Sequence, residues 1–263
     1  MIIHYLSDIH LEFFKQNIDF DKVFKFPENG EILCLAGDIG YPESEIYTRF
    51  LQYCTKYFKY IYLIAGNHEY YCGKNKEKTI QKTNNLIIKI CSDLKNVYFL
   101  NNEVSYNKEN DIYIIGTTLW TEIESSKKEL LIGYNDFNQI FYEYQDHRCC
   151  MNDMYMDLLN CESIDFLELE LEKLKNTNSK VLVMTHHLPT FELIHDKYKN
   201  HPQNFLFANH LDEYFEKYKI DAWICGHSHA KMNVNIKNTH LYLNPIGYPG
   251  ENKKYSTNES FNL

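Results

Sequence analysis

The chain has 263 residues, enough for one large domain or two small ones, with 44% hydrophobic and 24% charged residues. Its net charge of -9 at pH 7 disfavours electrostatic binding to nucleic acid, which depends on Lys and Arg side chains that neutralise phosphates. A small phosphorylated ligand is not excluded, because bound metal ions supply positive charge of their own.

The start of the chain enters an apolar run at once, without the basic and apolar regions of a signal peptide. No apolar stretch approaches the roughly 20 residues needed to span a bilayer, so no membrane association is expected. The eight cysteines form no C-x-x-C pair, which favours a reducing compartment. We therefore expect a cytoplasmic protein.

The first third of the chain alternates strand and helix patterns. Apolar runs predict strands at Ile2–Leu6, Ile32–Ala36 and Tyr60–Ala65. Apolar residues at helical spacing predict helices at Glu45–Phe58 and Thr79–Leu94. This alternation is typical of α/β proteins.

The middle of the chain is harder to interpret. Short strands are predicted at Val97–Leu100 and Ile112–Gly116. Residues 120–162 mix polar, aromatic and cysteine residues without a clean period, and a connection of this length is usually functional or mobile. A helix follows at Ser163–Leu174, with Ser163 as its N-cap.

The last third returns to short strands. They are predicted at Val181–Met184, Ala222–Cys225, Met232–Ile236 and His240–Leu243, with a helix at Leu211–Tyr218. Strand–helix alternation first and paired short strands last indicate two sheets covered by helices.

Five short polar islands stand at the ends of apolar runs. They read Asp8-Ile9-His10, Gly37-Asp38, Gly66-Asn67-His68-Glu69, His186-His187 and Gly226-His227-Ser228-His229. A strand of an open α/β sheet delivers such residues to the carboxyl edge of the sheet, where these folds place their sites. Five edges that deliver nitrogen and oxygen ligands to one place predict a metal centre.

The ligand types indicate the kind of metal centre. Two divalent ions ~3.5–4 Å apart can clamp a phosphoryl group and activate water for in-line attack. Two such cations against two carboxylates leave a positive centre, which suits a phosphate ester. A mixture of imidazole and carboxylate suits Mn, Fe or Zn better than Ca. The seven candidate ligands are Asp8, His10, Asp38, Asn67, His186, His227 and His229.

His186 and His187 compete for one ligand position. Successive residues of an extended chain point to opposite sides, so only one of the two is expected to face the metals. We favour His186 as the ligand, with His187 near the substrate or packed in the core.

In this order, the five islands resemble the D-x-H, G-D, G-N-H-(D/E), H and G-H-x-H blocks of the calcineurin-like metallophosphoesterases. The resemblance implies a single domain over residues 1–263, built as a four-layer α/β/β/α sandwich of two mixed sheets flanked by helices. Three further segments resemble a mostly bacterial branch of that family. They are Leu119-Trp120-Thr121, Asn135-Asp136-Phe137 and Asn244-Pro245-Ile246-Gly247-Tyr248.

The resemblance also implies a role for each residue of the islands. Asp8, His10 and His229 would hold the first metal ion. Asn67, His186 and His227 would hold the second, and Asp38 would bridge the two. His68 would bind no metal and would assist the leaving group. Glu69, at a position where Asp is the commoner family residue, would orient His68 and raise its basicity.

The implied function is hydrolysis of a small phosphomonoester or phosphodiester, with nucleotides among the candidates, by attack of a metal-bridging hydroxide. Loops near residues 120–145 and 188–207 are expected to shape the substrate pocket. The aromatic residues of the uninterpreted segment would either cover the site as a lid or pack in the core. They are Phe137, Phe141, Tyr142 and Tyr144.

Two other functions compete with this interpretation. A metal-dependent nuclease would show a basic groove, which the net charge opposes, although a local patch near Lys253-Lys254 would be compatible with one. A non-catalytic binding or scaffold protein on the same fold would show damaged motifs, whereas all five islands are intact.

Overall fold

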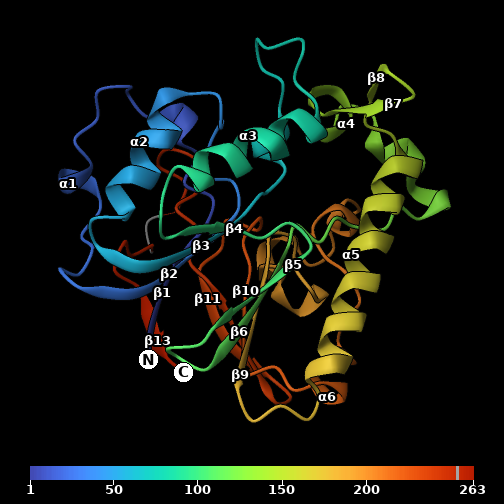
Figure 1. The fold of residues 1–263 in the computed structure, drawn as a ribbon. Coiled ribbons are helices and arrows are strands. Elements are labelled where there is room, and N and C mark those ends of the chain that lie inside the picture. Colours follow the sequence, from blue (N-terminus) through green and yellow to red (C-terminus); the bar gives the residue numbers. More distant parts are fainter. Residues whose placement is uncertain (253–254) are drawn as a thin grey trace.

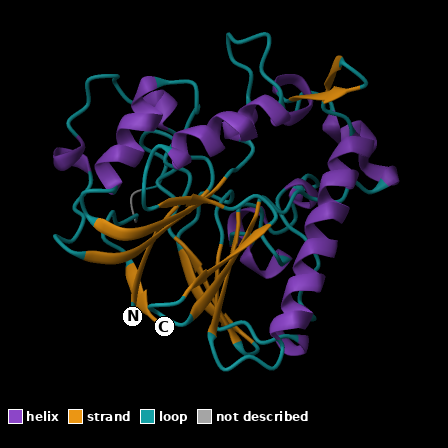
Figure 2. Ribbon diagram, viewed as in Figure 1, coloured by secondary structure: helices purple, strands orange, loops and turns teal. Residues whose placement is uncertain are grey.

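The computed structural model describes residues 1–252 and 255–263 and contains two large mixed β-sheets flanked by helices (Figures 1 and 2). The first sheet has the order β13-β1-β2-β3-β4, with β1 (Ile2–Leu6), β2 (Gly30–Ala36), β3 (Phe58–Ile64), β4 (Val97–Phe99) and β13 (Ser260–Asn262). The second has the order β11-β12-β10-β9-β6-β5, with β5 (Glu103–Asn107), β6 (Ile112–Thr117), β9 (Lys180–Thr185), β10 (Ala222–Ile224), β11 (Met232–Ile236) and β12 (Thr239–Leu243).

Helices cover the outer face of each sheet (Figure 2). The first sheet carries α1 (Phe20–Val23), α2 (Glu45–Cys54) and α3 (Ile80–Ser92), and the second carries α5 (Asp153–Leu174) and α6 (Tyr214–Lys217). The remaining elements are α4 (Asp136–Gln139), the hairpin β7 (Phe141–Tyr144) and β8 (His147–Cys150), and short 3-10 helices at Leu11–Phe13, His68–Tyr70, Ser125–Leu131, Phe191–Leu193, Asp196–Tyr198 and Asn204–Leu206. This arrangement confirms the expected α/β architecture with two helix-covered sheets.

The layers follow from the alternation of side chains along each strand. In β2, Cys34 points into the core between the two sheets, while Leu33 points toward the helices. In β9, Leu182 joins the same inter-sheet core and Val183 faces the opposite helix layer. Because successive residues face opposite sides of a sheet, strands buried on both faces are apolar throughout. This explains why these strands stand out in the sequence.

The helix predicted at Ser163 is wrong at its start. Helix α5 begins ten residues earlier, at Asp153, where the Asn152 side chain accepts a hydrogen bond from the Tyr155 amide at 2.9 Å. Met154 and Leu158 are exposed apolar residues in the first turns, so they obscure the periodicity that would have marked the helix. The helix predicted over Leu211–Tyr218 is also shorter, because α6 comprises four residues.

The segment 120–162 folds around the hairpin β7-β8, and the four aromatic residues considered as a lid, Phe137, Phe141, Tyr142 and Tyr144, are not among those that line the cavity over the site. Tyr142 is buried and stacks on Tyr155 with ring centroids 3.6 Å apart, and Phe137 packs against the core under the first sheet. Tyr144 is exposed on the hairpin. Of the two alternatives, core packing therefore describes Phe137 and Tyr142. No described helix is long and apolar enough to cross a membrane.

Candidate metal centre

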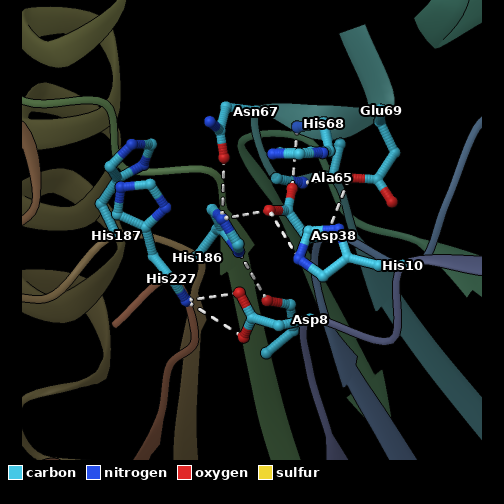
Figure 3. A network of polar contacts seen from close by, with 12 residues as sticks. Asp8, His10, Asp38, Ala65, Asn67, His68, Glu69, His186, His187 and His227 are labelled. Carbon is cyan, nitrogen blue, oxygen red and sulfur yellow. Dashed lines mark hydrogen bonds and ion pairs between the residues drawn. The ribbon is translucent and has the colours of Figure 1, made fainter. Parts of the chain in front are cut away.

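The seven candidate ligands meet at one place, where the two sheets abut, and Figure 3 labels all of them except His229. Strands β1, β2 and β3 run parallel, and so do β9 and β10, so their carboxyl ends deliver the polar islands to a common edge. The ligand atoms fall into overlapping groups whose members lie within 4.8 Å of one another. Two of these groups are Asp8, His10 and His229, and Asp38, His186 and His227.

The backbone at this edge is strained. The ligands Asp8, His10, Asp38, His227 and His229 all have φ between 49° and 64°, a region that non-glycine residues rarely occupy. Such strain persists where the surrounding structure over-determines the conformation, and it clusters at functional sites.

Two glycines of the islands are required because carboxylate oxygens of the site lie where a Cβ atom would be. A Cβ atom on Gly66 would collide with Asp38 Oδ1, and one on Gly226 would lie 2.7 Å from Asp8 Oδ2. Both approaches are closer than real Cβ atoms allow, so glycine at these positions lets the carboxylates reach the centre.

The first ligand group joins β1 to the loop after β10. His229 Nε2 lies 3.3 Å from Asp8 Oδ1 and 3.1 Å from His10 Nε2. Two imidazole nitrogens and a carboxylate oxygen thus converge on one point, which is the arrangement that a divalent transition metal requires.

The second ligand group joins the two sheets. His186 Nε2 lies 3.1 Å from Asn67 Oδ1 and 3.4 Å from Asp38 Oδ2. His227 Nε2 is buried and has no hydrogen-bond partner among the described residues. A buried polar atom without a partner costs free energy, and a metal ion is one partner that would satisfy it.

Asp38 lies between the two groups (Figure 3). Its Oδ2 atom is 3.4 Å from His186 Nε2 and 3.9 Å from His10 Nε2. Its Oδ1 atom accepts a hydrogen bond from the His68 amide at 2.8 Å, which fixes the carboxylate. One oxygen is therefore placed between the two groups, as a bridging ligand would be.

The charged groups of the site shift one another's pKa values. Burial disfavours the charged form of His186, but the carboxylates of Asp38 and Asp8 raise its pKa to about 10. Burial likewise opposes the charge on His229, while Asp8 and Glu251 raise its pKa to about 9. Burial also disfavours the ionised form of Asp38, but the neighbouring imidazoles hold its pKa well below the usual value. The site is therefore one that attracts cations.

Hydrogen bonds from outside the ligand set orient the ligands. The His186 Nδ1 atom lies 3.0 Å from the Ala36 carbonyl oxygen, and His229 Nδ1 lies 2.7 Å from Glu251 Oε2. Donation from Nδ1 in each ring leaves Nε2 free for a metal.

Two further carboxylates, which are not candidate ligands themselves, fix the orientation of His10 and Asn67. His10 Nδ1 lies 3.0 Å from Glu12 Oε1. The Asn67 amide donates to Asp136 Oδ1 at 2.8 Å, which turns the Asn67 oxygen toward His186. No ligand-orienting role for Glu12, Asp136 or Glu251 was predicted from the sequence. The signal in the sequence that would have indicated Glu12, which is half-buried, is an acidic residue two positions after the D-x-H island.

His68 lies beside the ligands, and both of its ring nitrogens already have partners. Nδ1 is 3.1 Å from Glu12 Oε1 and Nε2 is 3.1 Å from the Tyr248 hydroxyl. One nitrogen of His68 also falls within a ligand-like group with His10 and Asp38. The two hydrogen bonds nevertheless favour a proton-handling role for His68 over metal binding.

Glu69 does not orient His68, contrary to the expectation from the sequence. Its carboxylate accepts hydrogen bonds from the backbone amides of Gly66, Asp38, Ile39 and Gly40, at 2.7, 2.9, 2.6 and 3.3 Å. The partner of the His68 imidazole is Glu12 instead. Because His68 and Glu69 lie in one short helical turn, their side chains leave the backbone in different directions.

We expect Glu69→Ala to destabilise the fold by at least about 3 kcal/mol, because it leaves several buried amides without an acceptor. Urea unfolding of the metal-free protein measures this loss. The exposed Glu122→Ala serves as the control and should change the free energy of unfolding by less than about 0.5 kcal/mol. If the Glu69 variant has normal stability but no turnover, the result would support the role in catalysis that the sequence predicted for Glu69.

His187 is packed rather than directed at the ligands. Its ring is buried, lies 5.4 Å from the Trp120 ring and 4.3 Å from the His227 ring, and belongs to none of the ligand groups among the described residues. Burial lowers its pKa to about 3, so it is neutral. Of the two adjacent histidines, His186 is the one that faces Asp38 and Asn67.

A cavity of about 380 Å³ opens over the centre. Its floor includes Asp38, Asn67 and His227, and its walls come from residues 133–135, 194–207 and 248–251. The loops that were expected to shape the pocket therefore do so. No Lys or Arg of the described chain lines this cavity, whereas several aromatic rings do.

Comparison with known proteins supports these observations. The family model described as "Calcineurin-like phosphoesterase" matches residues 1–231. An "Uncharacterized protein L509" of Acanthamoeba polyphaga mimivirus is 28% identical over 270 residues, which cover 97% of this chain and 94% of that protein.

Two solved structures share the fold. A phosphopantetheinyl hydrolase from Mycobacterium tuberculosis superposes with a TM-score of 0.71 at 14% identity, covering 98% of this chain and 95% of the other. The TT1561 protein of Thermus thermophilus superposes with a TM-score of 0.54 at 8% identity, covering 93% of this chain and 88% of the other. At such identities the similarity is one of fold.

Proposed function

The chain belongs to the calcineurin-like phosphoesterase family, and we propose that it hydrolyses a small phosphomonoester or phosphodiester at a centre of two divalent ions. The observation that carries this proposal is the position of Asp38, whose Oδ2 atom faces His186 on one side and His10 on the other. A carboxylate between two ligand groups is what a two-metal phosphoesterase requires.

The donor set fits divalent transition metals. Asp8, His10 and His229 would hold one ion, with Asp38 shared. Asn67, His186 and His227 would hold the other. The mixture of imidazole nitrogens, carboxylates and one amide oxygen suits Mn, Fe or Zn. When bound, such ions polarise the phosphoryl group and allow water to act as a nucleophile at neutral pH.

The residues of the chain itself supply the remaining steps. His68 lines the cavity beside Asp38 and is held by Glu12, so it is placed to give a proton to the departing oxygen of the ester. Asp136 accepts a hydrogen bond from the Asn67 side-chain amide and so keeps the Asn67 oxygen directed at the centre.

The cavity favours a small substrate over a nucleic acid. Aromatic rings of Tyr134, Tyr198 and Phe207 line it, and no described Lys or Arg does. A groove for a polynucleotide would present such cations along its length. The Lys253-Lys254 patch that would be compatible with a nuclease lies outside the described residues. A cytoplasmic location, which the eight free cysteines favour, is part of the proposal.

Purified protein assayed with Mn tests this function. The panel contains p-nitrophenyl phosphate, its bis-ester, 2′,3′- and 3′,5′-cyclic nucleotides, and a phosphopantetheinyl ester, because one fold neighbour is named a phosphopantetheinyl hydrolase. We expect metal-dependent hydrolysis of at least one of these small esters. Elemental analysis without any bound transition metal, together with no hydrolysis after Mn is added, would contradict it and favour a scaffold role.

A further inference from the structure

Tyr248 lies directly beside the candidate centre, and the proposed chemistry above assigns it no role. Its hydroxyl is 3.1 Å from His68 Nε2, and its ring lies 4.6 Å from the His10 ring and 4.7 Å from the His229 ring. The residue lines the cavity and is 38% exposed. It thus reaches the pocket next to His68 and between the rings of two candidate ligands.

The loop that carries Tyr248 is fixed to the ligands by its backbone. The Gly247 amide donates to the Asp8 carbonyl oxygen at 2.8 Å, and the Tyr248 amide donates to Glu251 Oε2 at 3.0 Å. The same Glu251 oxygen is 2.7 Å from His229 Nδ1. The position of the hydroxyl is therefore tied to that of the ligands, as expected for a group that acts at the centre.

The Tyr248 hydroxyl keeps a proton to donate while it contacts His68. For His68 to protonate a leaving group, Nδ1–H donates to Glu12 and Nε2 carries the proton that is transferred. The oxygen of the Tyr248 hydroxyl then accepts from Nε2–H, so its own O–H is free to donate to another acceptor. When Nε2–H turns to the departing oxygen of an ester, the phenol remains protonated and remains a donor.

Two nearby polar groups of the cavity, on Tyr71 and Asn67, are already engaged. The Tyr71 hydroxyl donates to Asp136 at 2.7 Å, and the Asn67 amide donates to the same carboxylate. Since no described Lys or Arg lines the cavity, a phosphoryl oxygen that is not held by metal needs a neutral donor. Two oxygens of one phosphate are close neighbours, so donors 3.1 Å apart can reach both.

We propose that Tyr248 is a substrate-binding residue whose hydroxyl donates a hydrogen bond to a phosphoryl oxygen while His68 serves the leaving group. The inference rests on the proposed phosphoesterase function and adds a specific contact to it. Tyr248 could instead act only through His68, and the two roles have different consequences. A contact to the phosphoryl group affects all esters equally, whereas an effect through His68 depends on the leaving group.

The test compares Tyr248→Phe with the unaltered protein, both loaded with Mn. Calorimetric titration with inorganic phosphate measures the contact without turnover, and we expect phosphate affinity to fall about 10- to 100-fold, the range for a hydrogen bond to a charged group. The kcat/KM values for an activated and an unactivated ester should fall by the same factor. Metal content and Tm should stay unchanged, since the ring is kept.

A control variant sharpens the comparison. Tyr106→Phe removes an exposed hydroxyl that donates a hydrogen bond to Asp111, on the loop after β5, and it should leave phosphate affinity unchanged. A loss of phosphate affinity in Tyr106→Phe as large as that in Tyr248→Phe overturns the assignment.

The outcomes separate this inference from the proposed function. Unchanged phosphate affinity in Tyr248→Phe overturns the inference even if the enzyme is active, as does an unaltered protein that binds no phosphate. A defect confined to the unactivated ester also overturns it, because Tyr248 would then act through His68. Phosphate binding that Tyr248→Phe weakens, in a protein that cleaves no ester, supports the contact while contradicting the proposed activity.

Discussion

Asp38→Asn is expected to abolish turnover and to lower metal occupancy more than any other single change of a ligand. The carboxylate places Oδ2 between His186 and His10, and its other oxygen accepts the His68 amide. In the variant, the oxygen of the neutral side chain can keep the bond to the His68 amide, but the NH₂ group then faces the cations. An amide cannot donate equally to two metal ions, so both sites weaken together.

Metal content by elemental analysis decides the outcome for Asp38. We expect the Asp38 variant to retain less than one metal ion per chain and turnover to fall by about 10³-fold or more, the scale of a lost electrostatic contribution. Asp8→Asn is the matched comparison, because Asp8 belongs to one ligand group only and its loss should release chiefly one ion. Asp93→Asn, an exposed residue, controls for the substitution itself. An Asp38 variant with two metals and near-normal turnover would show that Asp38 does not bridge.

The convergence of the seven candidate ligands was predictable because each of them lies in a polar island at the end of an apolar run. Asp8, Asp38 and His186 each follow an apolar strand, and parallel strands bring their ends to one edge whatever the details of packing. The same reasoning predicted β1 with its observed bounds, since a strand that is largely buried on both faces is mostly apolar, with His4 as the polar exception in β1.

The partners of the ligands were not predictable in this way. Asp136 lies 69 residues from Asn67, and Glu251 lies 22 residues from His229, so only the folded chain shows that they meet. The predicted contact between Glu69 and His68 is wrong because residues that are adjacent in sequence need not have side chains in contact. The start of α5 was missed because exposed apolar residues such as Met154 weaken the contrast between its two faces.

His68→Ala is expected to keep both metals and still lose most of the activity. His68 is bonded through both ring nitrogens, to Glu12 and Tyr248, and all seven proposed ligands remain in the variant. Turnover of an ester with a poor leaving group should fall by ~10²–10⁴, the usual range for a lost general acid. His240→Ala, which removes an exposed imidazole from β12, is the control and should leave turnover unchanged.

The dependence on the leaving group distinguishes the acid role of His68 from a structural one. A p-nitrophenolate departs without a proton, whereas an alkoxide requires one, so the defect should be smaller for the activated ester. Glu12→Gln should give a weaker form of the same dependence on the leaving group, because Glu12 holds His68 Nδ1, and any loss of metal from this variant would report its second contact, to His10 Nδ1. An equal loss on both esters would remove His68 from the acid role. Loss of metal from purified His68→Ala would make it a ligand or a structural support, since proton transfer to a departing oxygen does not affect how tightly the ions are held.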